Sequence, residues 1–584
     1  MTLTKLFPFA CAALMMGACT SEDNDNKGGD AAGKAQYLAV NIVSVGSNGT
    51  RAANDNFENG TENESKINDV RFYFFNADGS PYILANTQGV NWTTPAENFN
   101  GDKNDDGNNV TQVSKAVLVF KSESGEAAPY SVIAVVNANS LANSIPNALG
   151  NSSKTLSQLL EQTVDNQFYL SDATGTLQTN YEKAAKAKNF VMTNSVYEEA
   201  GQRRCQAFIS GHVSATEELA KNNPVDIYVE RAVAKVTASL DENAGWVKGD
   251  GTNWDKDKYG KVVGKTTSGT NVYAVLEGWN IADENGMAEL EKQIQTGWTS
   301  NGLGFPTNEV WSSSDYHRSF WSESTPVGTA NNPTINYSYN QIAGNGFGSC
   351  VYTLPNTSQT AVANKYSNSL TKFIVATTLR YEDNDGNWHN AEICEYKGIQ
   401  YIGQDAVLDA IGSESGVYEK TNDGSNDVYT LIGHKQMKFV ADSKQQSKDY
   451  KAMATVDSGK YGDTSDVFYT KDGSGNFQSI SVSAVNALIQ RESADIRNGG
   501  KAYYYTTIRH LGIDENKPAY YGIVRNHVYK INLQDMKGFG TPVIDAEKVI
   551  IPTVPDNEAT YLAARINVLS WRIVNQNANL DYSK

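Results

Sequence analysis

The chain has 584 residues, of which 20% are charged, and a formal net charge of −17. This length allows two or three domains. No cluster of Lys or Arg is dense enough to neutralise a phosphate backbone, which argues against nucleic acid as a partner. The acidic excess mainly implies solubility and mutual repulsion. With 31 Tyr and 48 Gly, and with apolar residues in short runs, the composition favours a mainly β protein with many turns.

The first nineteen residues have the form of a bacterial lipoprotein signal. A lone basic residue, Lys5, precedes the apolar run Leu6–Met16, which is too short to span a bilayer. The run ends in Met16-Gly17-Ala18-Cys19. We expect residues 1–18 to be removed and Cys19 to carry the lipid that holds the precursor at the cell outer membrane. The alternative is an ordinary secretory signal in which Cys19 is incidental.

Strand-like segments dominate the first half of the chain. Residues 37–45 place Leu38, Val40 and Ile42 on one side, the period-two pattern of a half-buried strand. The polar loop that follows contains one basic residue, Arg51. Leucines at helical spacing predict a helix over residues 156–164. Further strands are expected at 70–75, 116–120, 130–137, 189–194 and 207–213.

The longest strand-like run, residues 225–240, marks a change of domain. Arg231 and Lys235 share the phase of its apolar residues, so part of the run must end or change face. Gly, Asn and Asp accumulate just after it, near 241–254. We therefore expect an N-terminal β domain at 52–245 and a C-terminal β domain at 246–555.

The C-terminal half mixes strands, helices and an insertion. We expect helices over 287–295 and 482–489, and an irregular, polar insertion at about 397–466 with a short helical piece at 406–411. Strands are expected at 271–280, 502–508, 520–524 and 527–533. A Pro-containing connector, 538–557, leads to a last strand over 560–574.

Motifs for catalysis or for metal binding are absent from the sequence. The acidic stretch 102–107 opens like a calcium loop, but its twelfth position is Val113 instead of Glu. Cys205, Cys350 and Cys394 are too widely spaced for a disulfide framework or a zinc site. No nucleophile elbow or paired-histidine motif occurs. We expect no cofactor, no metal and no enzymatic activity.

Several segments together resemble the Bacteroidales fimbrillins, the type V pilins, and specifically the Mfa-type subunit of minor (short) fimbriae. No single segment is specific, but their order and number are. The matching pieces are Met16-Gly17-Ala18-Cys19, Arg51-Ala52-Ala53-Asn54-Asp55-Asn56, Lys66-Ile67-Asn68-Asp69-Val70, residues 130–137, Met192-Thr193-Asn194, residues 228–235, Ala502-Tyr503-Tyr504-Tyr505, residues 522–529, and Arg565-Ile566-Asn567-Val568-Leu569-Ser570-Trp571.

The resemblance implies a pilin with two β-sandwich-like (transthyretin-like) domains, a few short helices and a C-terminal donor strand within 556–584. It also implies export as a lipoprotein. A trypsin-like, Arg-specific protease would then cut between Arg51 and Ala52, removing the propeptide 19–51 together with its strand. The loss of a strand exposes an unpaired edge, which a strand from a second subunit can fill.

The last strand is the natural donor, with Ile566, Val568 and Trp571 as its apolar residues. Head-to-tail filling of this kind generates an open filament. The resemblance implies a homopolymer with anchor and tip accessory subunits, extracellular after maturation, which binds host or bacterial surface ligands and supports adhesion and biofilm formation.

Four alternatives remain open. The last strand can instead close its own domain, and Arg51 can be an ordinary loop residue. A surface glycan-binding lipoprotein that does not polymerise would display aromatic platforms, for which Trp311, Tyr316 and Trp321 are the candidates, although such clusters are more often packing. A secreted hydrolase would need acid and base groups that converge in a cleft.

Overall fold

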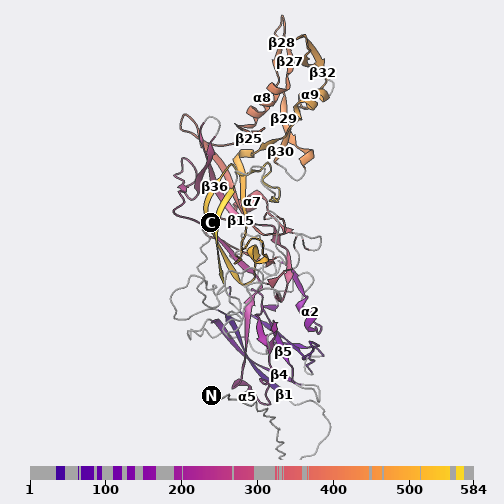
Figure 1. The fold of residues 1–584 in the computed structure, drawn as a ribbon, viewed down its shortest axis with the longest axis vertical. Coiled ribbons are helices and arrows are strands. Elements are labelled where there is room, and N and C mark those ends of the chain that lie inside the picture. The colour runs from indigo at the N-terminus through magenta and orange to yellow at the C-terminus, as the bar shows by residue number, and fades with distance from the viewer. Residues whose placement is uncertain are drawn as a thin grey trace, which may run out of the picture.

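The computed structural model describes residues 35–45, Glu64 and most of residues 67–570; its longest gaps there are 95–109, 139–148, 166–189, 295–321 and 553–560. Strands dominate these residues and five short α-helices accompany them, which confirms the mainly β fold. The molecule is elongated. Figure 1 shows the sheet that contains β1 (Ala35–Val45) at one end and the hairpin of β27 (Val417–Asn422) and β28 (Asp427–Leu431) at the other.

The first sheet runs in the order β3-β2-β5-β7-β11-β1-β4, with β10 paired to β5. Apart from β1, its strands are β2 (Val70–Phe75), β3 (Trp92–Thr93), β4 (Val110–Lys121), β5 (Ser131–Val136), β7 (Met192–Asn194), β10 (Ala207–Phe208) and β11 (Val225–Arg231).

Both faces of this sheet are buried around β2 and β5. Alternation along β2 sends Phe72 and Phe74 into one apolar cluster and Tyr73 and Phe75 into another. The helix α2 (Leu156–Leu160) covers the second face through buried Leu159, and Thr155 begins it with a capping box. A second helix, α5 (Glu217–Lys221), lies beside β1.

The chain passes from the first sheet to the second within the run 225–240. β11 ends at Arg231 in the first sheet, and β12 (Ala234–Leu240) begins three residues later in another sheet. The change of face expected from the phase of Arg231 and Lys235 is therefore a change of sheet. β12, which precedes residue 245, already belongs to the C-terminal body.

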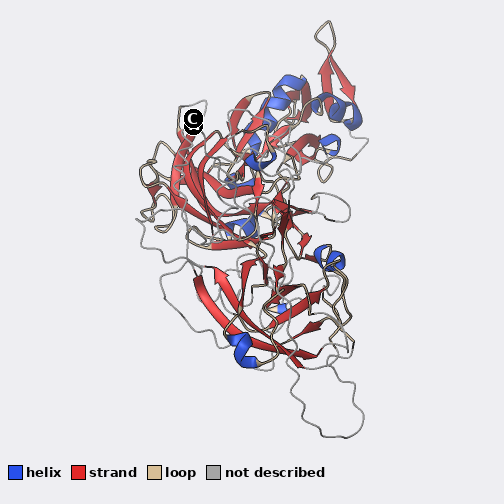
Figure 2. Ribbon diagram, turned by 60° about the horizontal axis from the view of Figure 1, so that its bottom comes forward, coloured by secondary structure: helices blue, strands red, loops and turns tan. Residues whose placement is uncertain are grey.

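Two sheets pack face to face in that body as a β-sandwich. One has the order β21-β12-β36-β38 and the other β13-β14-β15-β23-β34-β37, with β24 on β23. Figure 2 shows strands as the main element of both bodies. The new strands are β13 (Val247–Lys248), β14 (Tyr259–Lys265), β15 (Asn271–Ala282), β21 (Cys350–Thr353), β23 (Lys372–Glu382), β24 (Trp388–Asn390), β34 (Lys501–Thr507), β36 (His527–Lys537), β37 (Thr541–Pro542) and β38 (Tyr561–Ser570).

Between these sheets lies the largest apolar core. Val236 and Tyr529 enter it from one sheet, and Trp279 and Phe373 from the other. The helix α7 (Tyr339–Ala343) covers the opposite face of the larger sheet through Tyr339 and Ile342.

A separate module with its own core is inserted between β24 and β34. It contains one five-stranded sheet, β26-β25-β33-β30-β29, one four-stranded sheet, β28-β27-β31-β32, and two helices that pack on a common core. Its further elements are β25 (Ile393–Tyr396), β26 (Ile399–Ile402), α8 (Gln404–Ser415), β29 (Met437–Ala441), β30 (Lys451–Val456), β31 (Phe468–Lys471), β32 (Phe477–Ile480), α9 (Val482–Ile489) and β33 (Ala494–Ile496).

Short two-stranded ladders complete the described structure. They are β6 (Thr163–Asp165) with β17 (Met287–Glu289), β8 (Tyr197–Glu199) with β9 (Gln202–Arg204), β16 (Glu284–Asn285) with β20 (Thr334–Ile335), β18 (Gln293–Ile294) with β19 (Ser322–Glu323), and β22 (Asn356–Thr357) with β35 (Gly522–Ile523).

Some expectations from the sequence are wrong. The helix predicted over 156–164 ends at Leu160, and Val164 lies in the strand β6. Instead of the helix expected over 287–295, residues 287–289 form β17 and residues 293–294 form β18, because each finds a strand partner and buried Ala288 and Leu290 pack against the first sheet. The segment 397–466 is not irregular: its described residues form α8 and the strands β26 to β30.

Candidate functional site

β1 lies inside the first sheet and not at its edge. It runs parallel to β11, with Val40 opposite Val225, and antiparallel to β4, with Val40 opposite Ala116. Among the strands of this sheet, β4 pairs with β1 alone. Loss of β1 would therefore open a slot between β11 and β4, with unpaired backbone N–H and C=O groups along both sides.

The slot has an apolar floor. Leu38 of β1 is fully buried, in the same cluster as Val225, Ile227 and Val229 of β11. Leu118 of β4, directly opposite Leu38, belongs to this cluster too. A replacement strand must therefore present apolar side chains at alternate positions.

The predicted lipidation site Cys19 and the predicted cleavage site at Arg51 and Ala52 lie outside the described residues, and so do the aromatic candidates Trp311, Tyr316 and Trp321. These sites stay predictions. Their place in the sequence still matters, because Arg51 follows Val45, the last residue of β1. A cut after Arg51 would break the covalent link between β1 and the rest of the chain.

Glu64, the first described residue after Arg51, is fixed at the junction between the two bodies. It is 1% exposed; its carboxylate accepts a hydrogen bond from the Tyr352 hydroxyl (2.5 Å) and forms an ion pair with Lys235 (3.1 Å). Its backbone oxygen accepts a bond from Arg231 Nε at 2.6 Å. Burial lowers the pKa of Arg231 to about 10, although Glu64 raises it. The chain after the predicted cut is thereby anchored.

Sequence reasoning singled out Arg231 and Lys235 and missed Glu64 and Tyr352. Arg231 and Lys235 stood out because they share the phase of buried apolar positions. Two buried cations require a nearby anion, which is the signal that could have directed a search for a buried carboxylate. Nothing in the polar sequence around Glu64 distinguishes it from the exposed acids of this chain.

β38, which contains two of the three predicted donor residues, forms the edge of the four-stranded sheet. It pairs antiparallel with β36, with Ile566 opposite Ile531 and Val568 opposite Tyr529. Leu562 near its start is 7% exposed and belongs to the sandwich core. In the single chain β38 thus closes its own domain. An edge strand can nevertheless leave by breaking one ladder only. Trp571 lies outside the described residues.

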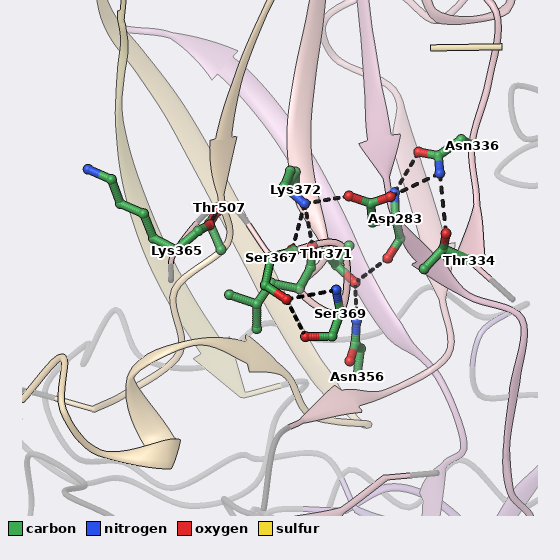
Figure 3. A network of polar contacts seen from close by, with 11 residues as sticks. Asp283, Thr334, Asn336, Asn356, Lys365, Ser367, Ser369, Thr371, Lys372 and Thr507 are labelled. Carbon is green, nitrogen blue, oxygen red and sulfur yellow. Dashed lines mark hydrogen bonds and ion pairs between the residues drawn. The ribbon is translucent and has the colours of Figure 1, made fainter. Parts of the chain in front are cut away.

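A buried polar network holds β15 and β23 together at one end (Figure 3). Lys372, fully buried, forms an ion pair with Asp283 and donates to the backbone oxygens of Ser367 (2.9 Å) and Leu370 (3.2 Å). Asn336 Nδ2 donates to Asp283 at 2.9 Å. Burial raises the pKa of Asp283, although the nearby Lys372 lowers it. Burial lowers the pKa of Lys372, although the nearby Asp283 raises it. Because these buried polar groups form hydrogen bonds and an ion pair with one another, we infer that the network has a structural role.

The described residues contain no group of three or more His, Cys, Asp or Glu side chains placed to hold a metal ion. Cys205 and Cys394 are buried thiols without a disulfide. Burial raises the pKa of Cys394 to about 12 and that of Cys205 further, so neither is a reactive thiolate. No helix in the described ranges is long and apolar enough to cross a membrane.

Solved structures of adhesion and fimbrial proteins are similar to this chain over most of its length. A fimbrilin (fimA) from Porphyromonas gingivalis W83 shares 13% identity at a TM-score of 0.34, covering 92% of this chain and 98% of that one. A putative cell adhesion protein from Parabacteroides distasonis ATCC 8503 shares 12% at 0.33, covering 92% and 98%. The tip fimbrial protein Mfa3 from Porphyromonas gingivalis, with C-terminal truncation, shares 10% at 0.30, covering 92% and 100%. At these TM-scores, the similarity assigns no role to any residue of this chain. No curated protein matches the sequence.

The C-terminal part matches a known family. Residues 498–577 fit the family described as "Major fimbrial subunit protein type IV, Fimbrillin, C-terminal". The matched stretch contains β34 to β38, and so includes both the strand β36 and its edge partner β38. The family consists of structural proteins and not of enzymes. Residues 498–577 are therefore a fimbrillin C-terminal region.

Proposed function

We propose that this protein is the structural subunit of a cell-surface fimbria that supports adhesion and biofilm formation, and that its subunits join by donor-strand exchange. The observation that carries the proposal is the position of β1: it fills the interior of the first sheet, yet it precedes Arg51, where a single cut would detach it. The fimbrillin match at residues 498–577 supports the fimbrial role.

Maturation follows in two steps. The chain is exported as an outer-membrane lipoprotein through Cys19. An Arg-specific protease then cuts between Arg51 and Ala52. The loop around Arg51 consists of small and polar residues, the type of segment that a protease can draw into its cleft. The contacts of Glu64 with Tyr352, Lys235 and Arg231 limit how far the new N-terminus can unravel.

Assembly then uses the two ends of the chain. β38 leaves the edge of its own sheet, and its residues Ile566 and Val568, with Trp571, enter the slot that β1 vacates in the next subunit. The donor and acceptor surfaces differ, so the contact is heterologous and extends into an open filament. Accessory subunits would anchor the filament and form its tip, and the filament would bind host or bacterial surface ligands.

Limited trypsin treatment followed by electron microscopy tests the cleavage. The folded precursor is expected to give a product that begins at Ala52 and forms filaments, whereas Arg51→Ala stays mostly monomeric. The matched control is Arg491→Ala, an exposed arginine at a bend between α9 and β33, which should assemble normally. Filaments of uncut Arg51→Ala protein would contradict the proposal.

Deletion of residues 560–584 separates a donor strand from an ordinary closing strand. A donor strand predicts a folded, Arg51-cleavable monomer that cannot extend a filament. A closing strand predicts that the sandwich unfolds at a much lower temperature, because Leu562 leaves the core. Since the deletion can itself lower stability, Ile566→Asp and Val568→Asp are compared with Asn567→Asp at an adjacent position. Assembly that survives both apolar-to-Asp changes would overturn the donor role.

A further inference from the structure

The first and last described strands carry the same pattern of residues. β1 ends in Val40-Asn41-Ile42-Val43-Ser44-Val45, and β38 runs into Ile566-Asn567-Val568-Leu569-Ser570-Trp571. In both segments the order is apolar, Asn, apolar, apolar, Ser, apolar, and the first and third residues are β-branched. The two segments lie at opposite ends of the chain and in different sheets.

In β1 this pattern occupies defined positions in the sheet. Val40 lies opposite Val225 of β11 and Ala116 of β4, and Ile42 lies opposite Ile227 and Ser114. The partners on β11, Val225 and Ile227, are buried in the apolar cluster that forms the floor of the slot. The positions of the pattern are thus matched to this slot residue by residue.

We infer that the C-terminal strand of a second copy of this chain enters the slot in one register, the one that superimposes the two patterns. Ile566 takes the position of Val40, Val568 that of Ile42, and Ser570 that of Ser44. The donor runs parallel to β11 and antiparallel to β4, as β1 does. This inference rests on the proposed donor-strand exchange and adds its register and direction.

Other registers lose the match. A shift by one residue puts Asn567 in the place of Val40 or Ile42, because alternate residues of a strand face opposite sides. A shift by two in one direction puts Ser570 in the place of Ile42, opposite buried Ile227. A shift by two in the other puts Ala564 in the place of Val40, where it fills less of the apolar floor. Only the superimposed register keeps β-branched residues at both positions.

The likeness also explains why cleavage must precede assembly. While β1 is attached to its own chain, it competes for the slot as an intramolecular segment at high effective concentration. A donor with nearly the same side chains gains little from contacts that β1 lacks, so it cannot displace a tethered β1. Once the link at Arg51 is cut, β1 loses that advantage, and the donor, which remains covalently part of a subunit, replaces it.

Disulfide trapping tests the register. In the inferred joint Asn567 takes the position of Asn41, opposite Lys115, and Leu569 takes that of Val43, opposite Val113. Directly opposed antiparallel residues are close enough for a disulfide. Filaments of Lys115→Cys/Asn567→Cys and of Val113→Cys/Leu569→Cys protein, assembled under reducing conditions, seen by electron microscopy and then oxidised, should each give a ladder of covalent multimers on a non-reducing gel.

The matched controls shift one partner by two residues, to Val113→Cys/Asn567→Cys and Val117→Cys/Asn567→Cys. They should give filaments without a ladder. The inferred register is wrong if filaments form and a control pair gives the ladder, or if filaments form and no pair gives it. Donor-strand exchange itself is tested separately, by the deletion experiment. If cleaved wild-type protein forms no filaments, the proposed function and the register fail together. A synthetic peptide of residues 36–45 should block growth as well as one of residues 562–571; failure of the β1 peptide alone would count against the inferred likeness.

Discussion

Lys372 and Asp283 form a buried ion pair, and removal of one member leaves the other without compensation. Lys372→Met leaves Asp283 buried and should cost about 3–5 kcal/mol of unfolding free energy, while Lys372→Met/Asp283→Leu should recover most of it. The control is Lys397→Met, whose partner Glu414 is 48% exposed, where we expect a change within about 1 kcal/mol. Urea unfolding measures all three. Equal losses at the buried and exposed sites would contradict this account of the network in Figure 3.

Glu291 should make stability depend on pH. Its side chain is fully buried, and burial raises its pKa from 4.5 to about 8, although Arg525 and Lys292 lower it. Between these pKa values the folded state holds a proton that the unfolded state has released, so stability falls as pH rises from about 4.5 to about 8. Glu291→Gln should therefore gain stability over wild type across this window. Urea unfolding near both limits measures it, with exposed Glu242→Gln as control; a gain that is the same at both limits would refute the assignment.

At the scale of elements, the sequence predicts best where one local signal suffices. The helix at 482–489 appears with these bounds, because Ser481 caps it and its apolar residues keep helical spacing. β1 follows directly from the alternation of Leu38, Val40 and Ile42. Where pairing with a distant strand determines the structure, the local spacing of apolar residues does not predict it. Leu290 and Ile294 have helical spacing, but the segments around them pair as strands with residues far away in sequence.

The same limit applies to the candidate site. Both ends of the exchange could be proposed from alternation and resemblance, whereas the interior position of β1 depends on pairing with β11 and β4, which lie far away in sequence. The contacts of Glu64 with Tyr352 and Lys235 join three distant segments. No local pattern specifies such contacts, so only the folded chain could reveal the anchor.

The inserted module should be removable as a unit. Its entry strand β25 pairs with its exit strand β33, with Glu395 opposite Asp495, so the chain leaves and rejoins the sandwich at one place. Replacing residues 397–493 with an Asn-Gly turn should join these strands as a hairpin. Arg497 must be kept, because it donates to the backbone oxygens of Phe539 and Ile393.

The shortened chain is expected to fold and to form filaments after cleavage, because the module packs on its own core and lies away from β1 (Figure 1). Thermal unfolding and electron microscopy test it. Loss of filaments in a shortened protein that still unfolds cooperatively would place the module at the joint between subunits.

For the whole molecule, the body that contains the first sheet and the C-terminal sandwich should differ in how much their stability depends on β1 and on β38. The first sheet needs a strand between β11 and β4 at all times, whereas β38 is an edge strand of the sandwich. Each large apolar side chain that a strand buries contributes about 1.5–3 kcal/mol. An empty slot should therefore weaken the N-terminal body far more than the loss of β38 weakens the sandwich.

A chain that begins at Ala52 and ends before Thr560 lacks both strands and makes this difference measurable. We expect two calorimetric transitions, with the N-terminal one at a clearly lower temperature than in the precursor. A peptide of residues 35–45 binds only the folded N-terminal body, so it should raise that transition with peptide concentration and leave the other unchanged. A peptide of residues 561–572 should also raise the N-terminal transition, because it supplies the donor pattern, and it can in addition pair with β36 of the sandwich, where β38 lies in the full chain. A scrambled version of either peptide should have no effect. If the truncated chain folds only when the peptide is present, refolding yield with and without the peptide gives the same answer. If the peptide of residues 561–572 raises only the transition of the sandwich, the slot of the first sheet does not accept the donor pattern, and the exchange proposed here would be wrong.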